Sequence, residues 1–199
     1  EAVAKADTIV FDKTGTLTHA CPRVAKIVPF GGKEEAEMLR LAACLEEHFP
    51  HSMANAVVEE ACRRGLTHEE RHARVEYLVA HGIASSVGEE QVRIGSAHFI
   101  FEDEKVTIPE GEREKFDALP PEYSQLYLAI DGVLAAVICI SDPLREEARD
   151  VLSALRGLGV RSAVMLTGDS PRTAAAIARE VGVDGFRAGV LPADKADYV

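Results

Sequence analysis

The residues best suited to take part in a chemical reaction are seven consecutive ones, DKTGTLT at positions 12–18. An apolar run at residues 8–11 precedes them and predicts a buried parallel strand. Asp12 would therefore stand at the carboxyl end of that strand, where open α/β sheets place ligands and chemistry. Residues 14–16 would then turn the chain sharply and offer hydroxyls and backbone N–H groups to an anionic group. A simple helix or turn cap would account for one Asp or Thr here, but not for the whole heptapeptide.

A second stretch whose residues could take part in a reaction is the tripeptide Thr167-Gly168-Asp169. It follows a predicted buried strand at residues 161–166 and precedes a helix that Ser170 begins as N-cap and Pro171 as first helical residue. If this strand lies beside the first one, the two strand ends together form a cradle for phosphate.

Composition and charge narrow the class of protein. A chain of 199 residues that is 47% hydrophobic and 28% charged is expected to fold into one large domain or two small ones. The net charge of −11 argues against a nucleic-acid surface. The longest apolar run, residues 133–140, is shorter than the about 20 residues that a membrane span needs. The four cysteines form no CxxC pair, so we expect free thiols, as in a cytosolic domain.

Between the two chemical stretches the pattern predicts a mixed α+β segment. The acidic residues 101–117 are expected to be surface helix and loop, and Asp131-Gly132 is a strong hairpin signal. Helices are expected at residues 34–46 and 53–64, the second with Ser52 as N-cap, and strands at 24–28, 75–79, 83–87, 91–94, 125–130 and 133–140.

The α/β pattern returns with a helix from Asp142 to about Leu158 and a last βα-like piece that carries residues 186–190. We therefore predict a parallel-sheet domain formed by residues 1–18 and 140–199, with an α+β domain inserted at residues 19–139. The chain does not begin with Met, and we expect a piece of a longer protein.

DKTGTLT resembles the phosphorylation motif of P-type ATPases. Its order with the later TGD tripeptide and with Pro192-Ala193-Asp194-Lys195 resembles the haloacid-dehalogenase-like phosphotransfer fold that these ATPases use. The resemblance implies that Asp12 is the nucleophile that takes the γ-phosphoryl group of ATP. Thr167 would then hydrogen-bond the phosphoryl oxygens, Asp169 would hold the turn and Lys195 would neutralise charge. The catalytic residues implied are Asp12, Lys13, Thr14, Thr167, Gly168, Asp169 and Lys195, and Asp12 and Thr14 are the implied ligands of Mg²⁺.

The residue type at position 14 separates two activities of this fold. Phosphatases of the fold generally carry an acid/base Asp two residues after the nucleophile, whereas this chain has Thr14. A hydroxyl cannot act as a general base near neutral pH as a carboxylate can, so water attack on the acyl phosphate should be slow. A long-lived aspartyl phosphate favours an ATPase over a phosphatase.

Glu46 and His51 resemble the adenine-contacting Glu and His of the heavy-metal-transporting P-type ATPases. That branch reads Ser-Glu-His-Pro-Leu-Ala, whereas this chain reads FPHSMA at residues 49–54, so Ser52 replaces the Pro. His48 is the alternative to His51.

The same branch has a Gly-x-Gly followed by a later Gly-Asn, which let the backbone approach the nucleotide. Gly82 matches the first segment, with Ala80 in place of its leading Gly, and Gly95-Ser96 matches the second, with Ser in place of Asn. The implied nucleotide-binding residues are thus Glu46, His51, Gly82, Gly95 and Ser96.

Together these features predict the ATP-binding and phosphorylation domains of a cation-transporting P-type ATPase of the heavy-metal type, with ATP and Mg²⁺ as cofactors. The implied partners are the actuator and transmembrane domains of the same pump. The fragment is expected to be a monomeric cytoplasmic domain of an integral membrane protein. The alternatives are a phosphatase of the same fold and a non-catalytic nucleotide-binding module.

The resemblance also implies how active this stretch of chain would be by itself. The family places a Gly-Asp-Gly-x-Asn-Asp loop after Asp-Lys, and the carboxylates of that loop hold Mg²⁺ beside the nucleophile. In this sequence the loop would follow Val199, so further Mg²⁺ ligands are expected after that residue. Residues 1–199 are therefore expected to bind nucleotide but to turn over ATP poorly.

Overall fold

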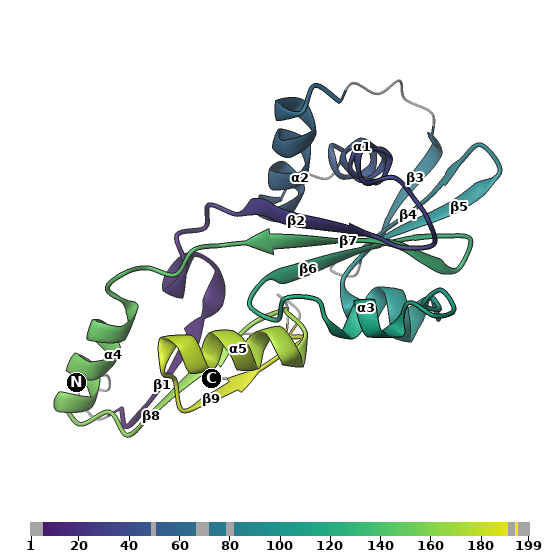
Figure 1. The fold of residues 1–199 in the computed structure, drawn as a ribbon. Helices are drawn as coiled ribbons and strands as arrows, with labels where there is room; N and C mark the ends of the chain where they lie inside the picture. Colours follow the sequence, from purple (N-terminus) through teal and green to yellow (C-terminus); the bar gives the residue numbers. More distant parts are fainter. Residues whose placement is uncertain (1–5, 49–50, 67–71, 79–81, 191–193, 195–199) are drawn as a thin grey trace. The chain divides into compact units, whose positions relative to one another are not determined.

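The computed structural model describes residues 6–48, 51–66, 72–78, 82–190 and 194, with only the backbone of 72–78. The chain divides into two compact units (Figure 1). The discontinuous unit contains residues 1–21 and 142–199, and the inserted unit contains residues 22–141. None of the helices within the described residues is long and apolar enough to cross a lipid bilayer.

The discontinuous unit is built on a parallel sheet of the order β1-β8-β9. Its core contains Leu152 of α4, Met165 of β8 and Ile177 of α5, all buried. The strands are β1 (Thr8–Asp12), β8 (Ser162–Leu166) and β9 (Gly185–Arg187), and the helices are α4 (Ala148–Gly157), α5 (Pro171–Val181) and the short π-helical turn η2 (Lys13–Leu17). The predicted α5 is confirmed, because the Ser170 hydroxyl accepts the Thr173 N–H and Pro171 begins the helix.

Two predictions for this unit, a buried β1 and a helix that begins at Asp142, are wrong. β1 pairs in parallel with β8 as expected, but its residues are half-exposed rather than buried, because β1 forms an edge of the described sheet. The last βα-like piece, which carries residues 186–190, contributes the strand β9 at Gly185–Arg187.

The helix predicted from Asp142 begins only at Ala148. The segment before it instead pairs with the chain that follows η2: Leu144 forms an antiparallel bridge with Thr18, and the Arg145 N–H donates to the Leu17 carbonyl at 2.9 Å. An Asp-Pro pair often begins a helix, but here the residues after it form hydrogen bonds with a distant part of the chain instead.

The inserted unit is built on a six-stranded antiparallel sheet of the order β2-β7-β6-β5-β4-β3. Asp131 and Gly132 both adopt positive φ, 49° and 76°, so the predicted two-residue hairpin between β6 and β7 is confirmed. The strands are β2 (Arg23–Pro29), β3 (His72–Leu78), β4 (Gly82–Val87), β5 (Glu90–Gly95), β6 (Ser124–Ile130) and β7 (Val133–Ser141), and the helices are α1 (Glu35–Glu46), α2 (Ser52–Arg63), the π-helical η3 (His98–Asp103) and α3 (Arg113–Asp117).

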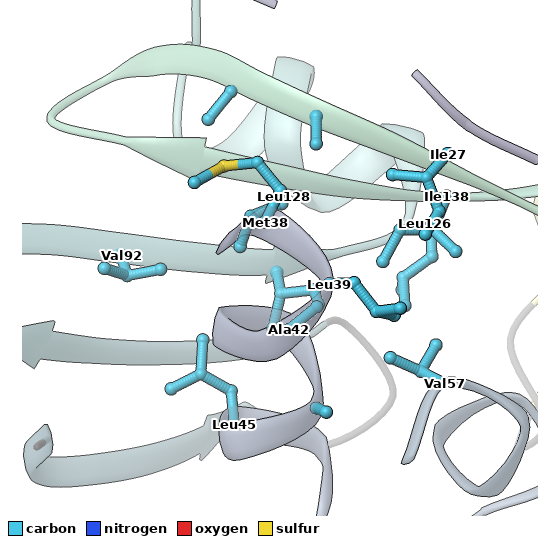
Figure 2. Packing of buried hydrophobic residues seen from close by; sticks show 14 of the residues in the cluster. Ile27, Met38, Leu39, Ala42, Leu45, Val57, Val92, Leu126, Leu128 and Ile138 are labelled. Carbon is cyan, nitrogen blue, oxygen red and sulfur yellow. The ribbon is translucent and has the colours of Figure 1, made fainter. Parts of the chain in front are cut away.

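Both faces of this sheet are covered. On one face, Met38, Leu39 and Leu45 of α1 pack towards Val92 and Leu128 of the sheet (Figure 2). The long apolar positions of α1 recur every three or four residues, which gives the helix the one apolar face that such packing needs.

The opposite face carries a second core that the sequence did not predict. Residues 101–117 were expected at the surface because they are acidic, yet Phe101 and Phe116 pack edge to face with their ring centroids 5.5 Å apart. Phe101 also meets Tyr127 of β6 at 5.2 Å, and Phe99 is fully buried beside them. Because the neighbouring residues are charged, the sequence pattern did not reveal these aromatic side chains, which pack η3 and α3 against the sheet.

The four cysteines are free thiols, as predicted. Cys139 is fully buried in β7, and burial raises the pKa of its thiol to about 11. This thiol therefore stays neutral and contributes as a packed side chain.

Candidate active site

The parallel register of β1 and β8 brings the two predicted chemical stretches together. Asp12 pairs with Leu166 across the sheet, so Thr167 lies one residue beyond the partner of Asp12. Both strands therefore end at the same edge, and both run straight into turns. This is the adjacency that the phosphate-cradle prediction required.

A buried ion pair joins the two turns. The Lys13 Nζ lies 2.7 Å from the Asp169 Oδ2, and the two side chains are 6% and 9% exposed. Because Lys13 and Asp169 are 156 residues apart in the chain, this contact closes a long loop around the inserted unit's sequence. Charges this well buried are costly to leave unpaired, so each residue depends on the other.

The turn after β8 is ordered by its own side chains. The Thr167 hydroxyl donates to the Asp169 Oδ2 at 2.8 Å and accepts the Asp169 N–H at 3.1 Å. Thr167 is 2% exposed, and its backbone N–H donates to the Arg187 carbonyl of β9. Asp169 thus accepts from both Lys13 and Thr167, and its position holds the start of α5 next to the end of β1.

The turn after β1 depends on glycine. Gly15 has φ +79°, in the left-handed region that side chains rarely adopt. Its N–H donates to the Thr18 Oγ1 at 3.1 Å, which closes the turn. Thr14 is exposed on this turn, and no carboxylate stands at position 14.

In the inserted unit, Glu46 and His51 lie next to each other. Glu46 ends α1 and is 2% exposed, whereas the His51 ring is 45% exposed, and their Oε2 and Nε2 atoms are 3.2 Å apart. The geometry of this contact is not that of a hydrogen bond, and Glu46 Oε2 has no hydrogen-bond partner among the described residues. A buried carboxylate oxygen without a donor costs about 1–3 kcal/mol, so this atom favours a ligand that brings an N–H group.

The cap of α2 is His51, not Ser52 as predicted. The His51 Nδ1 accepts the Ala54 N–H at 3.2 Å, and Ser52 becomes the first helical residue. An acceptor at Nδ1 places the proton of the neutral ring on Nε2, the atom that faces Glu46. The alternative, His48, lies with its Nε2 3.6 Å from Glu47 instead.

Gly82 and Gly95 form a second pair, directly opposite each other in β4 and β5. A Cβ on Gly82 would come within 2.4 Å of the Phe99 ring and 2.5 Å of the Ile94 carbonyl, so packing alone already requires glycine there. Ser96 caps the following turn, because its Oγ accepts the Phe99 N–H at 3.2 Å.

Several positions named in the sequence predictions lie outside the described residues. Among them are residue 79, the last of a predicted strand, and Pro192 and Ala193 of the segment before Lys195. They also include Ala80, which replaces the leading glycine of the nucleotide segment, Lys195, the implied charge-neutralising residue, and Val199, after which further Mg²⁺ ligands were expected. The roles and ligands predicted at these positions therefore stay predictions.

Asp142 and Arg145 contact the turn after Asp12 but were missed by sequence reasoning. The Asp142 Oδ2 accepts the Thr18 hydroxyl at 2.6 Å, and the Arg145 guanidinium donates to the Gly15 carbonyl at 3.4 Å. The sequence signal for these contacts was a pair of charged residues at the boundary between the two units. It was overlooked because Asp142-Pro143 was interpreted as the start of a helix.

The turn after β1 carries oxygen atoms of the kind that magnesium prefers. Magnesium prefers hard oxygen ligands, which the Asp12 carboxylate and the Thr14 carbonyl can supply. Asp169 is already bonded to Lys13 and Thr167. Within the described residues, no three His, Cys, Asp or Glu side chains are grouped so that they could hold a metal ion. Asp12 and Thr14 therefore fit a partial coordination shell that water and nucleotide phosphates would extend.

The chain belongs to the haloacid dehalogenase-like hydrolase family, which matches residues 6–198. Its sequence is 38% identical to the zinc-exporting P-type ATPase of Mycobacterium marinum over 100% of this chain and 27% of that protein. It is 39% identical to the manganese-exporting P-type ATPase of Mycobacterium tuberculosis over 98% of this chain and 27% of that protein. The resemblance predicted from the motifs is thus confirmed.

The solved structures agree. A zinc-transporting PIB-type ATPase in the E2.Pi state matches with 36% identity and a TM-score of 0.59, over 99% of this chain and 31% of that chain. The predicted fold class, a haloacid-dehalogenase-like parallel sheet with an inserted α+β unit on an antiparallel sheet, is confirmed. The chain spans about a quarter of the length of these curated relatives.

Proposed function

We propose that this chain is the nucleotide-binding and phosphorylation part of a P-type ATPase that exports a metal cation. The observation that carries the proposal is the meeting of the Asp12 and Thr167 strand ends, held by the buried Lys13–Asp169 pair. The discontinuous unit would be the phosphorylation domain, and the inserted unit would be the nucleotide-binding domain. Similarity along the whole of this chain to exporters of zinc and of manganese supports the metal-exporting class.

In the proposed reaction, a carboxylate oxygen of Asp12 attacks the γ-phosphorus of ATP. The bond between that phosphorus and the β,γ-bridging oxygen breaks, and its electron pair leaves with ADP. Asp12 then carries an aspartyl phosphate. Mg²⁺, when bound through Asp12 and Thr14, would offset the negative charge of the phosphoryl oxygens.

Two other groups would stabilise the transferred phosphoryl group. α5 begins at Pro171, after the turn that carries Thr167 and Gly168, and helix N-termini favour anions. The Thr167 hydroxyl would turn from Asp169 towards a phosphoryl oxygen, and Lys195 would add a positive charge. Lys13 would act through Asp169, because its ammonium is already bonded there.

The nucleotide base would bind beside Glu46 and His51. The Glu46 Oε2, which has no hydrogen-bond partner within the part of the chain that the structure describes, could accept an N–H of the adenine amino group, and the exposed His51 ring offers a flat surface for the base. Gly82, Gly95 and Ser96 remain proposed contacts of the same nucleotide. The transported cation would bind elsewhere in the pump. The actuator and transmembrane domains would be further parts of the same protein, and the part described here would lie in the cytoplasm.

The test is to supply γ-labelled ATP to the complete gene product and to look for an acid-stable, hydroxylamine-sensitive label on Asp12. A label that Asp12→Asn removes supports the proposal. A haloacid-dehalogenase-like phosphatase is the second candidate, but exposed Thr14 in place of an acid/base carboxylate disfavours it. Rapid hydrolysis of p-nitrophenyl phosphate without a trapped label would favour the phosphatase, and nucleotide binding without either activity would favour a non-catalytic module.

A further inference from the structure

The end of β9 and the residues just after it are bonded to the turn that carries Thr167 and Asp169. The Thr167 N–H donates to the Arg187 carbonyl at 3.0 Å, and the Thr167 carbonyl accepts the Val190 N–H at 3.0 Å. The Gly189 N–H donates to the Asp169 carbonyl at 2.9 Å, and Gly189 has φ +63°, in the left-handed region that favours glycine. These three backbone hydrogen bonds fix the position of Arg187 beside the Thr167 turn.

Arg187 also lies in the same row of the parallel sheet as Asp12. Asp12 pairs with Leu166 of β8, and Leu166 pairs with Arg187 of β9. Residues in register across a sheet direct their side chains to the same face, so Asp12 and Arg187 share a face at the end where their strands stop. Two strand spacings, roughly 10 Å, separate their Cα atoms, which leaves room for phosphate groups between the two side chains.

The side chain of Arg187 is accessible to a ligand. Phe186, the residue before it, packs against the core that contains Met165 of β8. Because successive side chains of a strand alternate, Arg187 faces away from that core, and it is exposed. Lys13, another cation near this edge of the sheet, is buried and paired with Asp169. Arg187 can therefore bring to an incoming phosphate a positive charge that Lys13 has already committed elsewhere.

We propose that Arg187 is a catalytic residue that binds the β-phosphate of ATP and stabilises the charge of the leaving ADP. This inference rests on the proposed function. In-line transfer places the attacking and the leaving oxygen on opposite sides of the γ-phosphorus. Asp12 lies on one side of the Thr167 turn and Arg187 on the other, because β8 runs between β1 and β9. With Thr167 on the γ-phosphoryl oxygens, the leaving oxygen lies towards Arg187.

The chemistry of the guanidinium group suits this role. When the bond to the γ-phosphorus breaks, the bridging oxygen keeps the electron pair, and the new negative charge is shared by the β-phosphate oxygens. The planar fork of N–H donors on Arg187 can form two parallel hydrogen bonds to those oxygens, and it remains protonated throughout.

The first measurement is the rate at which γ-labelled ATP labels Asp12 in the complete gene product. Arg187→Gln is expected to slow labelling roughly 100-fold, the usual cost of removing one preorganised donor to a developing charge. Arg187→Lys keeps the charge but loses the fork, so its rate should fall between the two. Arg179→Gln removes an exposed positive charge at the other end of α5 from the Thr167 turn, and this matched control should label at the unaltered rate.

The second measurement separates an action on the leaving group from a general loosening of the turn. ADP added to the labelled protein reverses the transfer: its β-phosphate oxygen attacks the phosphorus, and the Asp12 carboxylate leaves. Arg187→Gln should slow this ADP-dependent loss of label about as much as it slows labelling, whereas loss of label to water, which involves no ADP, should stay within about twofold. Amide exchange of the Thr167 N–H should not change, because the Arg187 carbonyl that accepts it belongs to the backbone.

Equal labelling rates in Arg187→Gln and the unaltered protein would overturn the catalytic role alone. Equal slowing of the losses to ADP and to water, or faster exchange of the Thr167 N–H, would also overturn it, since both would indicate a loosened turn. Absence of the acyl phosphate in the unaltered protein would overturn the proposed function, and this inference with it.

Discussion

In the discontinuous unit, the candidate residues come from turns far apart in sequence, and side-chain hydrogen bonds and one buried ion pair tie those turns together. In the inserted unit, Glu46 and His51 come from the facing ends of two consecutive helices, and a single 3.2 Å contact relates them. The first arrangement has its polar groups satisfied within the protein. In the second, the buried Glu46 Oε2 lies 3.2 Å from His51 Nε2 but has no hydrogen-bond partner among the described residues, as an oxygen that receives a ligand's donor would.

The difference suggests separate tasks. A nucleophile must keep one orientation, so its surroundings are rigid and internally bonded. A binding site gains selectivity when its polar groups are satisfied only by the right ligand, since an ill-matched one leaves them unpaired. Variants that alter one unit, with a measurement of whether the other unit responds, can test this division.

The largest effect is expected for Asp12→Asn. The amide cannot form an acyl phosphate, so labelling from γ-labelled ATP should fall below detection, while ATP affinity should not decrease. Asp7→Asn changes an exposed acid just before the same strand and should leave labelling intact. Residual label in the Asp12 variant would assign the nucleophile to another residue.

Lys13→Met should destabilise the discontinuous unit by about 3 kcal/mol, because it leaves Asp169 buried without its cation. Amide exchange resolved by residue should report the loss around β1 and β8, with the inserted unit unaffected. The double variant Lys13→Met, Asp169→Leu is expected to be more stable than Lys13→Met alone. A double variant whose two effects simply add would argue against a coupled pair.

Gly82→Ala should cost the inserted unit about 2 kcal/mol, because the new Cβ would overlap the Phe99 ring and the Ile94 carbonyl. Thermal unfolding of the chain would measure it. Gly157→Ala is the matched control, since no atom lies within 4 Å of its added Cβ, and its stability should be equal or higher. If Gly82→Ala is as stable as the control yet binds ATP weakly, nucleotide contact rather than packing requires the glycine.

His51 combines a cap with a proposed ligand contact, and two substitutions separate them. His51→Ala should lose about 1 kcal/mol of α2 stability and about tenfold in ATP affinity. His51→Asn restores a good N-cap and should recover the stability but not the affinity. Thermal unfolding measures the stability, and ATP titration followed by backbone amide shifts measures the affinity. Equal affinities in all three proteins would place the base elsewhere.

The smallest effect concerns the charge cluster that joins α1 and α2. Hydrogen bonds from Arg63, and further ones from Arg64, lower the pKa of Glu60 to about 2, and Arg64 also contacts Glu35 at 2.7 Å. A lowered pKa means that this stabilisation is present above pH 4.5 and is lost as the pH falls towards 2. Glu60→Gln should therefore cost about 1 kcal/mol at pH 7 and less at about pH 2, as thermal unfolding at the two pH values would measure. A cost that does not change with pH would contradict the assignment.

Local sequence predicted most of the secondary structure. Asp131-Gly132 formed its hairpin and Ser170-Pro171 began its helix, because the residues that decide these features are adjacent. The same reasoning failed where one sequence signal had two possible uses. Asp142-Pro143 looked like a helix start, but the carboxylate is bonded to Thr18, 124 residues away.

The DKTGTLT heptapeptide by itself predicted Asp12 as the nucleophile and indicated the family, since the motif is contiguous and this combination of seven residue types rarely arises by chance. Only the tertiary structure decided which groups hold that motif: the parallel register of β1 and β8 brings Lys13 to Asp169, and the segment before α4 brings Asp142 to Thr18. It also decided that His51, rather than Ser52, caps α2. Residue types define what chemistry is possible, but contacts between distant residues depend on the packing of the whole unit, which no local pattern encodes.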